Sequence, residues 1–314
     1  MNNQISLNQA ISLFLEAKKA QCLSQNTMID YERTLRNFQQ FLESDPPIDS
    51  ITTTDVRRFL NSLSHLSKKS LRNVYIGLSS LWTWLIEEEY TNIHLIRKIK
   101  PPKPEIRAIE PYTYEELQRM FSVLHRSREF NIPGKRPFTI AKPNPLRNYA
   151  ILLVLLDTGI RNSELCNLKV CDFNPSHPSS IKVFGKGAKE RVVPISEVTL
   201  QAIQDYLQKE RGNYTEDDFL FVVDDENKPF RPDTLHRVIK RICQQAGVRR
   251  THLVHRFRHT FAVNFLKKTH NPYALQRILG HQSLDIVKRY LALVDADVFE
   301  AHAEASPVMN LIAK

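Results

Sequence analysis

Glycine and cysteine are both scarce in this chain of 314 residues. Only 8 glycines accompany 17 prolines, which argues against a glycine-rich nucleotide-binding α/β protein and favours helices separated by prolines. The four cysteines are too few for a disulfide framework, and none of them forms a CxxC pair. They therefore predict neither disulfide bridges nor a zinc site, and they fit a reducing compartment.

Long apolar segments are also missing. The longest uninterrupted apolar run, Ala150 to Leu156, is far shorter than the roughly 20 residues that cross a bilayer. The first residues, MNNQISLNQAISLF, lack the basic stretch followed by an apolar stretch that is typical of a signal peptide. We therefore expect a cytoplasmic protein, associated with the nucleoid and without a membrane partner.

The chain has an excess of positive charge. The formal net charge is +10 and the sequence pI is about 9.4, which indicates a polyanionic partner, most often nucleic acid. Many basic proteins bind no polyanion, so charge alone leaves this open. Most of the excess lies in residues 112–314, whereas residues 1–98 are nearly neutral. Hydrophobic residues make up 42%, enough for a proper core.

Residues 1–98 are predicted to form a bundle of four helices. Apolar residues recur at helical spacing in two early segments, around Leu7 to Phe14 and Tyr31 to Leu42. Thr54 is the expected N-cap of a helix over 55–63. A longer helix is predicted from about Ser67 to Glu88.

Three cationic residues, Lys68, Lys69 and Arg72, cluster near the start of this longer helix. They form either a phosphate-contacting DNA-binding patch or an ordinary solvated helix face, and the sequence favours neither.

The stretch KIKPPKPEIRAIEP contains four prolines with interleaved charges, as expected for a semi-rigid linker over 99–111. A second domain is predicted over 112–298, mostly helical, with a β-hairpin formed by 180–184 and 190–195 around GKGAK. Residues 299–314 form a tail. The expected fold class is therefore mainly α with a small β-sheet.

Four short motifs contain polar residues that can act on a ligand. Arg161 follows a helix-ending glycine in TGIRNSEL, and Lys186 lies at the tip of the hairpin. His255 and Arg258, three residues apart in HRFRH, share one helix face. LGH, which contains His281, is followed nine residues later by Tyr290. Each motif alone also fits a bland interpretation, such as a turn arginine or a half-buried packing tyrosine.

A metal site at the histidines is disfavoured. His255 and His259 have the i, i+4 spacing of HExxH, but Arg256 stands where that motif has glutamate. The neighbouring cationic side chains would also repel a metal ion. We expect no metal and no other cofactor.

Taken together, GIRNSEL, GKGAKERVVPI, HRFRHTFA, LGHQ and Tyr290 occur in the order and approximate spacing of a known family. Over nearly its whole length the chain resembles the tyrosine recombinases, or phage integrases. The resemblance implies a SAM-like helical core-binding domain followed by an α+β catalytic domain, closing as a C-shaped clamp on DNA. It also implies a catalytic set made of Arg161, Lys186, His255, Arg258, His281 and Tyr290, with Glu164 orienting the first arginine.

The chemistry of this set suits a phosphodiester. Two arginines donate to its non-bridging oxygens, where charge grows in the transition state. Tyr290 would be the nucleophile, His255 a candidate for its proton transfer and Lys186 the acid for the 5′-oxygen. The resulting 3′-phosphotyrosine retains the bond energy, so rejoining would need neither ATP nor metal.

The resemblance further implies a homotetramer that joins two double-stranded DNA sites and exchanges strands through a Holliday junction, with accessory proteins possible. Two differences from the usual pattern of Xer resolvases and compact family members favour integration or excision of a mobile element. Leu291 and Ala292 follow Tyr290 where Xer resolvases usually have a histidine two residues on, and the segment 126–145 is longer than in compact members. The alternatives are an Xer-type resolvase and a non-catalytic DNA-binding protein on the same scaffold.

The tail, residues 299–314, is expected to dock on a neighbouring protomer or to fold back on its own domain.

Overall fold

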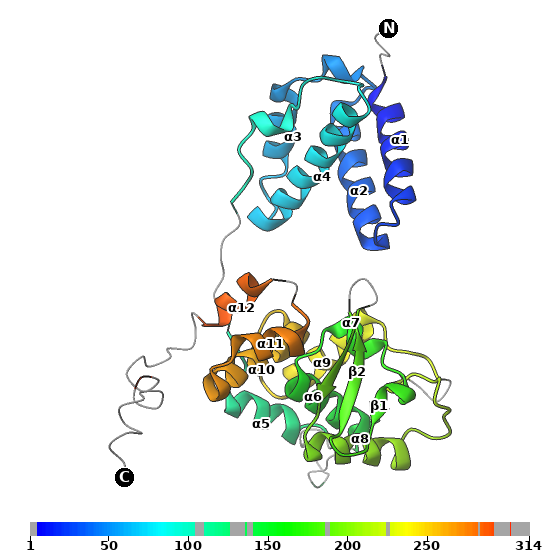
Figure 1. Ribbon diagram of the computed structural model, residues 1–314, viewed down its shortest axis with the longest axis vertical. Helices are drawn as coiled ribbons and strands as arrows, with labels where there is room; N and C mark the ends of the chain where they lie inside the picture. Colours follow the sequence, from blue (N-terminus) through cyan, green and yellow to red (C-terminus); the bar gives the residue numbers. More distant parts are fainter. Residues whose placement is uncertain are drawn as a thin grey trace. The chain divides into compact units, whose positions relative to one another are not determined.

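A computed structural model describes residues 5–103, 110–125, 136, 141–185, 189–223, 227–281, 283–291 and 302. This part of the chain is mainly helical and includes a three-stranded antiparallel sheet (Figure 1). The predicted fold class is thereby confirmed. The chain divides into two compact units, residues 1–107 and 108–314, and the division falls inside the segment predicted as a linker. No helix of the described residues has the length and apolar character needed to cross a membrane.

The first unit contains four α-helices within the described residues: α1 (Leu7–Ala20), α2 (Gln25–Leu42), α3 (Thr53–Ser62) and α4 (Lys68–Glu87). Each begins after a serine or threonine whose hydroxyl accepts a hydrogen bond from the backbone N–H three residues on. The predicted cap Thr54 is wrong, because Thr52 caps α3. Asp55 lies three residues after Thr52 and completes a reciprocal capping box with it.

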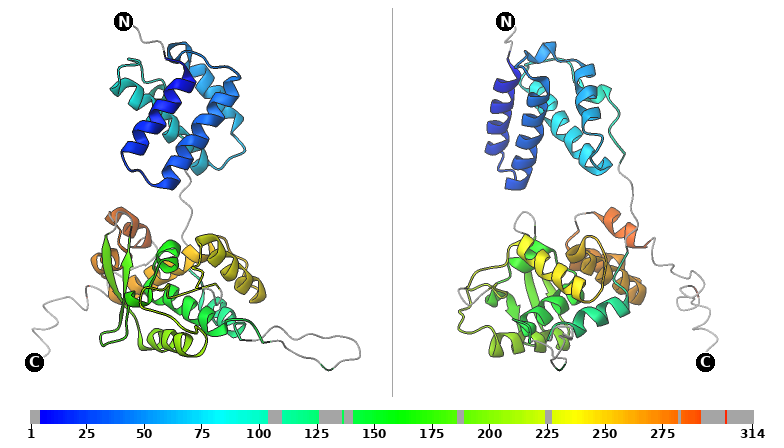
Figure 2. Two further views of the ribbon diagram at one scale, coloured as in Figure 1. Left: turned by 90° about the vertical axis from the view of Figure 1, so that its right-hand side faces the viewer. Right: turned by 180° about the vertical axis from the view of Figure 1, so that it is seen from behind.

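The apolar faces of these helices enclose one core. α1 and α2 lie side by side and both contact α4 (Figure 2). Trp82 and Phe38 are fully buried at the centre and meet edge to face. The chain beyond α4 is held by the hydroxyl of Tyr75, which lies 3.0 Å from the carbonyl oxygens of both Ile96 and Ile99 and shares its one proton between them.

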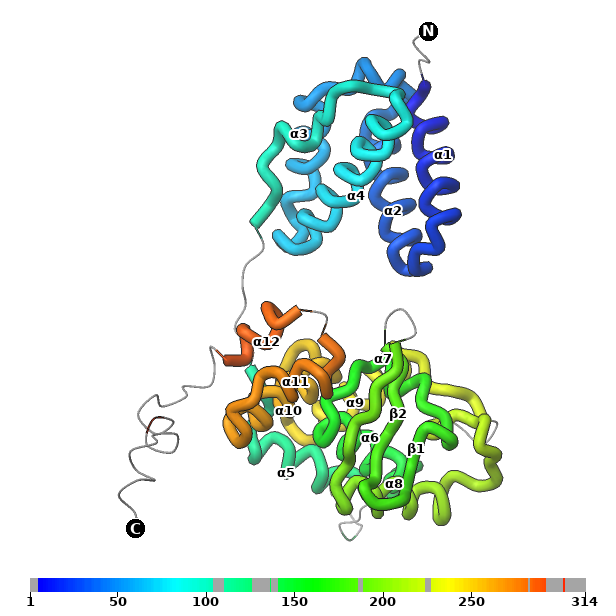
Figure 3. Tube along the Cα trace, viewed as in Figure 1, coloured from blue at the N-terminus to red at the C-terminus, as the bar shows by residue number. Residues whose placement is uncertain are grey.

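The second unit begins with α5 (Tyr114–Ser122), α6 (Pro145–Thr158) and α7 (Asn162–Cys166), and then forms the sheet from β1 (Phe173–Asn174), β2 (Ser180–Phe184) and β3 (Glu190–Pro194). It continues with α8 (Glu197–Lys209), α9 (Pro232–Gln245), α10 (Leu253–Thr269), α11 (Pro272–Leu279) and α12 (Leu284–Leu291). The path of the chain through these elements is shown in Figure 3. α10 starts three residues earlier than 256, where the sequence predicted it.

The sheet has the order β1-β2-β3 with both pairs antiparallel. Ile181 pairs with Val193, and both are buried on the core face together with Val183. Alternate residues such as Val192 point outward and are exposed, as the two-residue period of a strand requires. The described part of the hairpin ends at Gly185 and resumes at Lys189, and residues 186–188 are outside the described residues.

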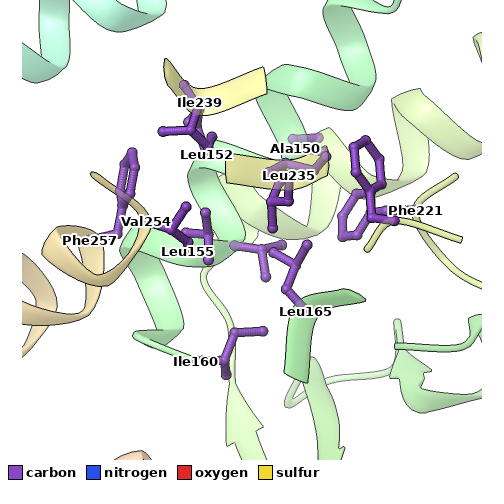
Figure 4. Close-up of a cluster of buried hydrophobic side chains, with 14 of the residues drawn as sticks. Ala150, Leu152, Leu155, Ile160, Leu165, Phe221, Leu235, Ile239, Val254 and Phe257 are labelled. Atoms are coloured by element: carbon purple, nitrogen blue, oxygen red, sulfur yellow. The ribbon is translucent and has the colours of Figure 1, made fainter. Parts of the chain in front are cut away.

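The main core of this unit lies between α6, α7, α9 and α10. Figure 4 shows Leu155 of α6, Leu165 of α7, Ile239 of α9 and Phe257 of α10 in this cluster, each at most 1% exposed. A smaller cluster joins α10, α11 and α12, and it includes Tyr290. Close packing therefore fixes the helices that contain the predicted site residues.

Gly159 directs the chain from α6 towards Arg161. It ends the helix in the left-handed region at φ +61, which glycine adopts without a Cβ penalty. A Cβ there would lie 2.7 Å from Phe261 Cδ1 and 2.9 Å from Leu279 Cδ2. Both the backbone angle and the close approach therefore require glycine.

We predict that Gly159→Ala lowers the free energy of unfolding by at least the roughly 1–3 kcal/mol typical of a strained left-handed residue. Gly212→Ala is the matched control, since Gly212 also has positive φ but its Cβ would meet nothing within 4 Å. Denaturant unfolding of both variants measures the difference. An equal loss in the two would show that the Phe261 and Leu279 contacts are unimportant.

Candidate active site

The structure brings together four residues that the sequence places in separate motifs. Arg161 precedes α7, Arg258 lies on α10, His281 follows α11, and Tyr290 lies on α12. α12 packs against both α10 and α11, as Figure 1 shows. The site is therefore formed where the ends of these helices meet.

Arg258 is the most deeply buried cation of the site, at 2% exposure. Its guanidinium donates to the carbonyls of Gly159 and Leu279, each at 2.8 Å. These carbonyls belong to the C-terminal ends of α6 and α11. Burial, together with the nearby Arg161, lowers the pKa of Arg258 to about 10, so it stays charged at neutral pH.

His281 is held by the same guanidinium. Arg258 Nη2 donates to His281 Nε2 at 2.6 Å, so Nε2 must be unprotonated and the ring proton resides on Nδ1. Burial and the adjacent arginines lower the pKa of His281 to about 4, which keeps the ring neutral. Among the described residues its buried Nδ1 has no hydrogen-bond partner. A bound anion would satisfy this donor.

Glu164 organises the other arginine. Its carboxylate accepts from Arg161 Nη1 at 2.8 Å and from the Arg161 backbone N–H at 2.7 Å. Burial alone would raise the pKa of Glu164, but hydrogen bonds from Arg191 and from Arg161 outweigh it and lower the pKa to about 2. The contact with Arg161 is the one that the family resemblance implies.

Arg191, on β3, is a site residue that the sequence did not predict. It donates to both oxygens of Glu164, at 3.0 and 2.8 Å, and through Nε to the carbonyl of Ile278 at 2.7 Å. It therefore links the hairpin to α7 and to the end of α11, beside His281. Its position within GKGAKERVVPI was the available signal, but nothing in that motif indicates which carboxylate it meets.

Tyr290 is buried at 2% exposure, and its hydroxyl lies 2.9 Å from Nδ1 of His259. Its ring is parallel to that of His281, with centroids 6.5 Å apart. Burial raises the pKa of Tyr290, while the charges of Arg258, Arg289 and Arg161 act in the opposite direction. The sequence does not predict this contact between His259 and Tyr290.

Comparison with known proteins places the whole arrangement in a family. The model of the phage integrase family matches residues 115–296, and that of the phage integrase N-terminal SAM-like domain matches residues 11–89. Tyrosine recombinase XerC of Staphylococcus haemolyticus is 30% identical over 294 residues, covering 90% of this chain and 92% of XerC. XerD of Halalkalibacterium halodurans is 26% identical over 312 residues, covering 96% and 99%.

The chain belongs to the phage integrase family of tyrosine recombinases.

Among solved structures, one chain of a lambda integrase tetramer bound to a Holliday junction superimposes on this chain with a TM-score of 0.72 at 18% identity. The match covers 92% of this chain and 78% of that chain. At this identity the likeness shows the fold. The family assigns to this chain the reaction class of site-specific DNA recombination.

The predicted recombinase site includes two further residues, His255 and Lys186. His255 is exposed at the first turn of α10, and its ring meets that of His259 at 4.4 Å between centroids. Lys186 lies outside the described residues. The hairpin next to it is closed by a hydrogen bond from Gly185 N–H to the Lys189 carbonyl at 2.8 Å.

The predicted DNA-binding cluster lies on the first unit. Lys68 and Lys69 are exposed in the first turn of α4, and half-buried Arg72 donates to the carbonyl of Pro102 at 3.4 Å. Within the described residues no group of three or more His, Cys, Asp or Glu side chains is arranged to hold a metal ion.

The charges of the recombinase site suit one phosphodiester. The bidentate pair of Arg191 with Glu164 is neutral as a pair, which leaves the positive charges of Arg161 and Arg258. A phosphodiester contributes one negative charge, and more accumulates on its oxygens during nucleophilic attack. Fixed guanidinium donors bind such oxygens strongly, above all where burial limits screening by water.

Acid should lower the free energy of unfolding of the recombinase by protonating Glu164. Because folding lowers its pKa, its contribution is present above the unfolded value of about 4.3 and is lost as the pH falls towards about 2. The shift corresponds to about 3 kcal/mol of unfolding free energy. Denaturant unfolding between pH 5 and 2 should show this slope in the native protein and not in Glu164→Gln. Glu197→Gln, which alters an exposed carboxylate of α8, is the control, and the same slope in Glu164→Gln would contradict the assignment.

Proposed function

We propose that this recombinase cleaves and rejoins double-stranded DNA through a covalent 3′-phosphotyrosine on Tyr290. One observation supports this most strongly. Arg161 and Arg258 come together with the unpartnered Nδ1 donor of His281, next to the hydroxyl-bearing ring of Tyr290.

In the proposed reaction the Tyr290 oxygen attacks the phosphorus and the bond to the 5′-oxygen breaks. Arg161, Arg258 and the Nδ1 proton of His281 stabilise the non-bridging oxygens. Lys186 donates the proton that the 5′-oxygen needs. The phosphotyrosine ester keeps the energy of the broken bond, so a second 5′-hydroxyl can reverse the step without ATP, metal or other cofactor.

We further propose that Tyr290 acts within its own protomer. This proposal is supported by the burial of Tyr290 in the cluster that joins α10, α11 and α12. There the charges of Arg258 and Arg161 of the same chain act on Tyr290. Delivery to a neighbouring protomer would require α12 to leave this cluster.

The proposed partner is a specific duplex site bound by both units, with Lys68, Lys69 and Arg72 contacting phosphates and the two units forming a clamp. Exposed lysines at the start of α4 support this, because they lie where backbone N–H groups also favour an anion. We also propose that four protomers assemble on two DNA sites in the cytoplasm. Accessory proteins can join this assembly. The tetramer of lambda integrase on a Holliday junction supports the stoichiometry.

The test uses a nicked duplex whose binding site is selected by the protein from a randomised DNA pool. Cleavage opposite the nick releases a short strand and traps the covalent adduct. We expect an adduct with the native protein and none with Tyr290→Phe, which lacks the attacking oxygen. Denaturing gels and peptide mass spectrometry measure it. Site-specific binding without any adduct would instead favour a non-catalytic DNA-binding protein.

Within recombination, we propose integration or excision of a mobile element, for which Leu291, Ala292 and the long segment 126–145 are the support. The Xer relatives favour chromosome resolution as the alternative. Sequencing of DNA trapped as the adduct in cells separates the two. Sites at the ends of an element fit integration, and a single chromosomal locus fits resolution.

We propose that the tail, residues 299–314, docks on a neighbouring protomer. A groove of about 780 Å³ lies between α5, α6 and α10, lined by Leu117, Phe121, Leu156, Phe261 and Phe265 with Lys268 at its edge. The tail offers apolar residues at Val308, Met309, Leu311 and Ile312 and acidic ones at Glu300 and Glu304. Its composition therefore complements the groove. Apart from residue 302, the tail is outside the described residues.

Phe265→Asp should place an unpaired charge in the groove and abolish cooperative assembly on two DNA sites, with single-protomer binding retained. Gel-shift titrations count the protomers per DNA. Deletion of 299–314 should have the same effect, and the double change no more than either alone. Val198→Asp, on an exposed apolar residue of α8, is the control. Normal assembly of Phe265→Asp would exclude the groove and favour a tail that folds on its own domain.

A further inference from the structure

The side chain of His259 lies within hydrogen-bond distance of the reacting atom of the proposed nucleophile. Its Nδ1 lies 2.9 Å from the Tyr290 hydroxyl, a contact between residues 31 positions apart in the chain. The two rings are inclined at 53° with centroids 5.6 Å apart. This geometry is that of a hydrogen bond in the protein without DNA.

The direction of that hydrogen bond follows from the protonation states. Burial raises the pKa of Tyr290, so its hydroxyl is protonated at neutral pH. Burial, followed by the charges of His255, Arg256, Arg258 and His252, lowers the pKa of His259 to about 3, so its ring is neutral. A neutral imidazole accepts through one nitrogen, and a phenol donates. Tyr290 thus donates to Nδ1 of His259.

His255, the residue that the sequence suggested for this proton transfer, is placed one turn earlier on α10. It is exposed and contacts the ring of His259. His259 is half-buried between His255 and Tyr290. His259 makes a direct contact with the phenol oxygen of Tyr290.

We propose that His259 is a catalytic residue that receives the phenolic proton of Tyr290 during cleavage. This inference rests on the proposed function above. The O–H bond of Tyr290 breaks and its proton passes to Nδ1, the Tyr290 oxygen bonds to phosphorus, and the bond to the 5′-oxygen breaks with protonation by Lys186. In rejoining, His259 returns the proton to the departing Tyr290.

The surrounding charges link this transfer to DNA binding. The charged or basic groups that act on His259 are His252, which precedes α10, and His255, Arg256 and Arg258 on α10, and Tyr290 contacts it from α12. Without DNA they make His259 a weak base, and Tyr290 stays protonated. A phosphodiester bound to Arg258 offsets part of this charge, and the charge growing on its oxygens offsets more. His259 therefore becomes a stronger base as the phosphate is attacked.

The test measures single-turnover cleavage of the selected nicked duplex. His259→Ala should slow cleavage about 10²-fold, within the usual range for loss of a general base, with DNA binding unchanged in gel shifts. His259→Asn is the discriminating variant, because its amide oxygen can accept a hydrogen bond but cannot take up a proton. We expect it to be as slow as His259→Ala. Recovery of the native rate by Asn would reduce His259 to a positioning role and overturn the proposal.

A second arm changes the nucleophile. Replacing Tyr290 by 3,5-difluorotyrosine lowers the phenol pKa and lessens the need for a base. It should raise the cleavage rate of His259→Ala at least tenfold and that of the native protein much less. Equal effects in the two backgrounds would refute a base role. His177→Ala, at a histidine whose side chain is 90% exposed, controls for loss of a histidine as such and should cleave normally.

A third arm separates base from acid. A bridging 5′-sulfur leaves without a proton, so it should restore cleavage by Lys186→Ala but not by His259→Ala. Restoration of both would contradict the assignment of His259. Failure of the proposed function is distinguishable, because the native protein would then form no Tyr290-dependent adduct on any of these substrates.

Discussion

The buried carboxylate of Glu164 is the interaction on which the site depends. A charge with 5% exposure is costly unless it is paired and fully hydrogen-bonded. Glu164 meets that condition with two guanidinium groups and a backbone N–H. In doing so it fixes Arg161, which faces the proposed phosphate site, and Arg191, which holds the end of α11. One carboxylate therefore sets the positions of groups from α7, β3 and α11.

Arg258 performs the corresponding task for the other half of the site. Its buried guanidinium occupies the carbonyls at two helix ends, which have no partner within their own helices. Both helices end at a glycine of positive φ, Gly159 and Gly280, and each turn leads directly to a site residue. The same hydrogen bonds that satisfy these carbonyls thus orient Arg161 and His281.

Structure and reactivity are connected through desolvation. Tyr290 is buried and His259 and His281 are partly buried, so all three are neutral at rest although cationic groups surround them. A binding site with net positive charge and neutral acid–base groups is poised for an anion. Under the proposed mechanism, this arrangement would keep a tyrosine with an ordinary pKa of about 10 inert without DNA and let it act as the nucleophile beside a phosphate.

The sequence by itself determined the helical character, the start of the long helix near Ser67, the hairpin, and the motifs that contain Arg161, Arg258, His281 and Tyr290. These features depend on neighbours within a few residues, so local spacing is enough to predict them. Only the tertiary structure paired Arg191 with Glu164, 27 residues away, and His259 with Tyr290. Which of the histidines on α10 faces Tyr290 depends on how α10 and α12 are rotated against each other. Packing of the shared core decides that rotation, and no local pattern in the sequence encodes it.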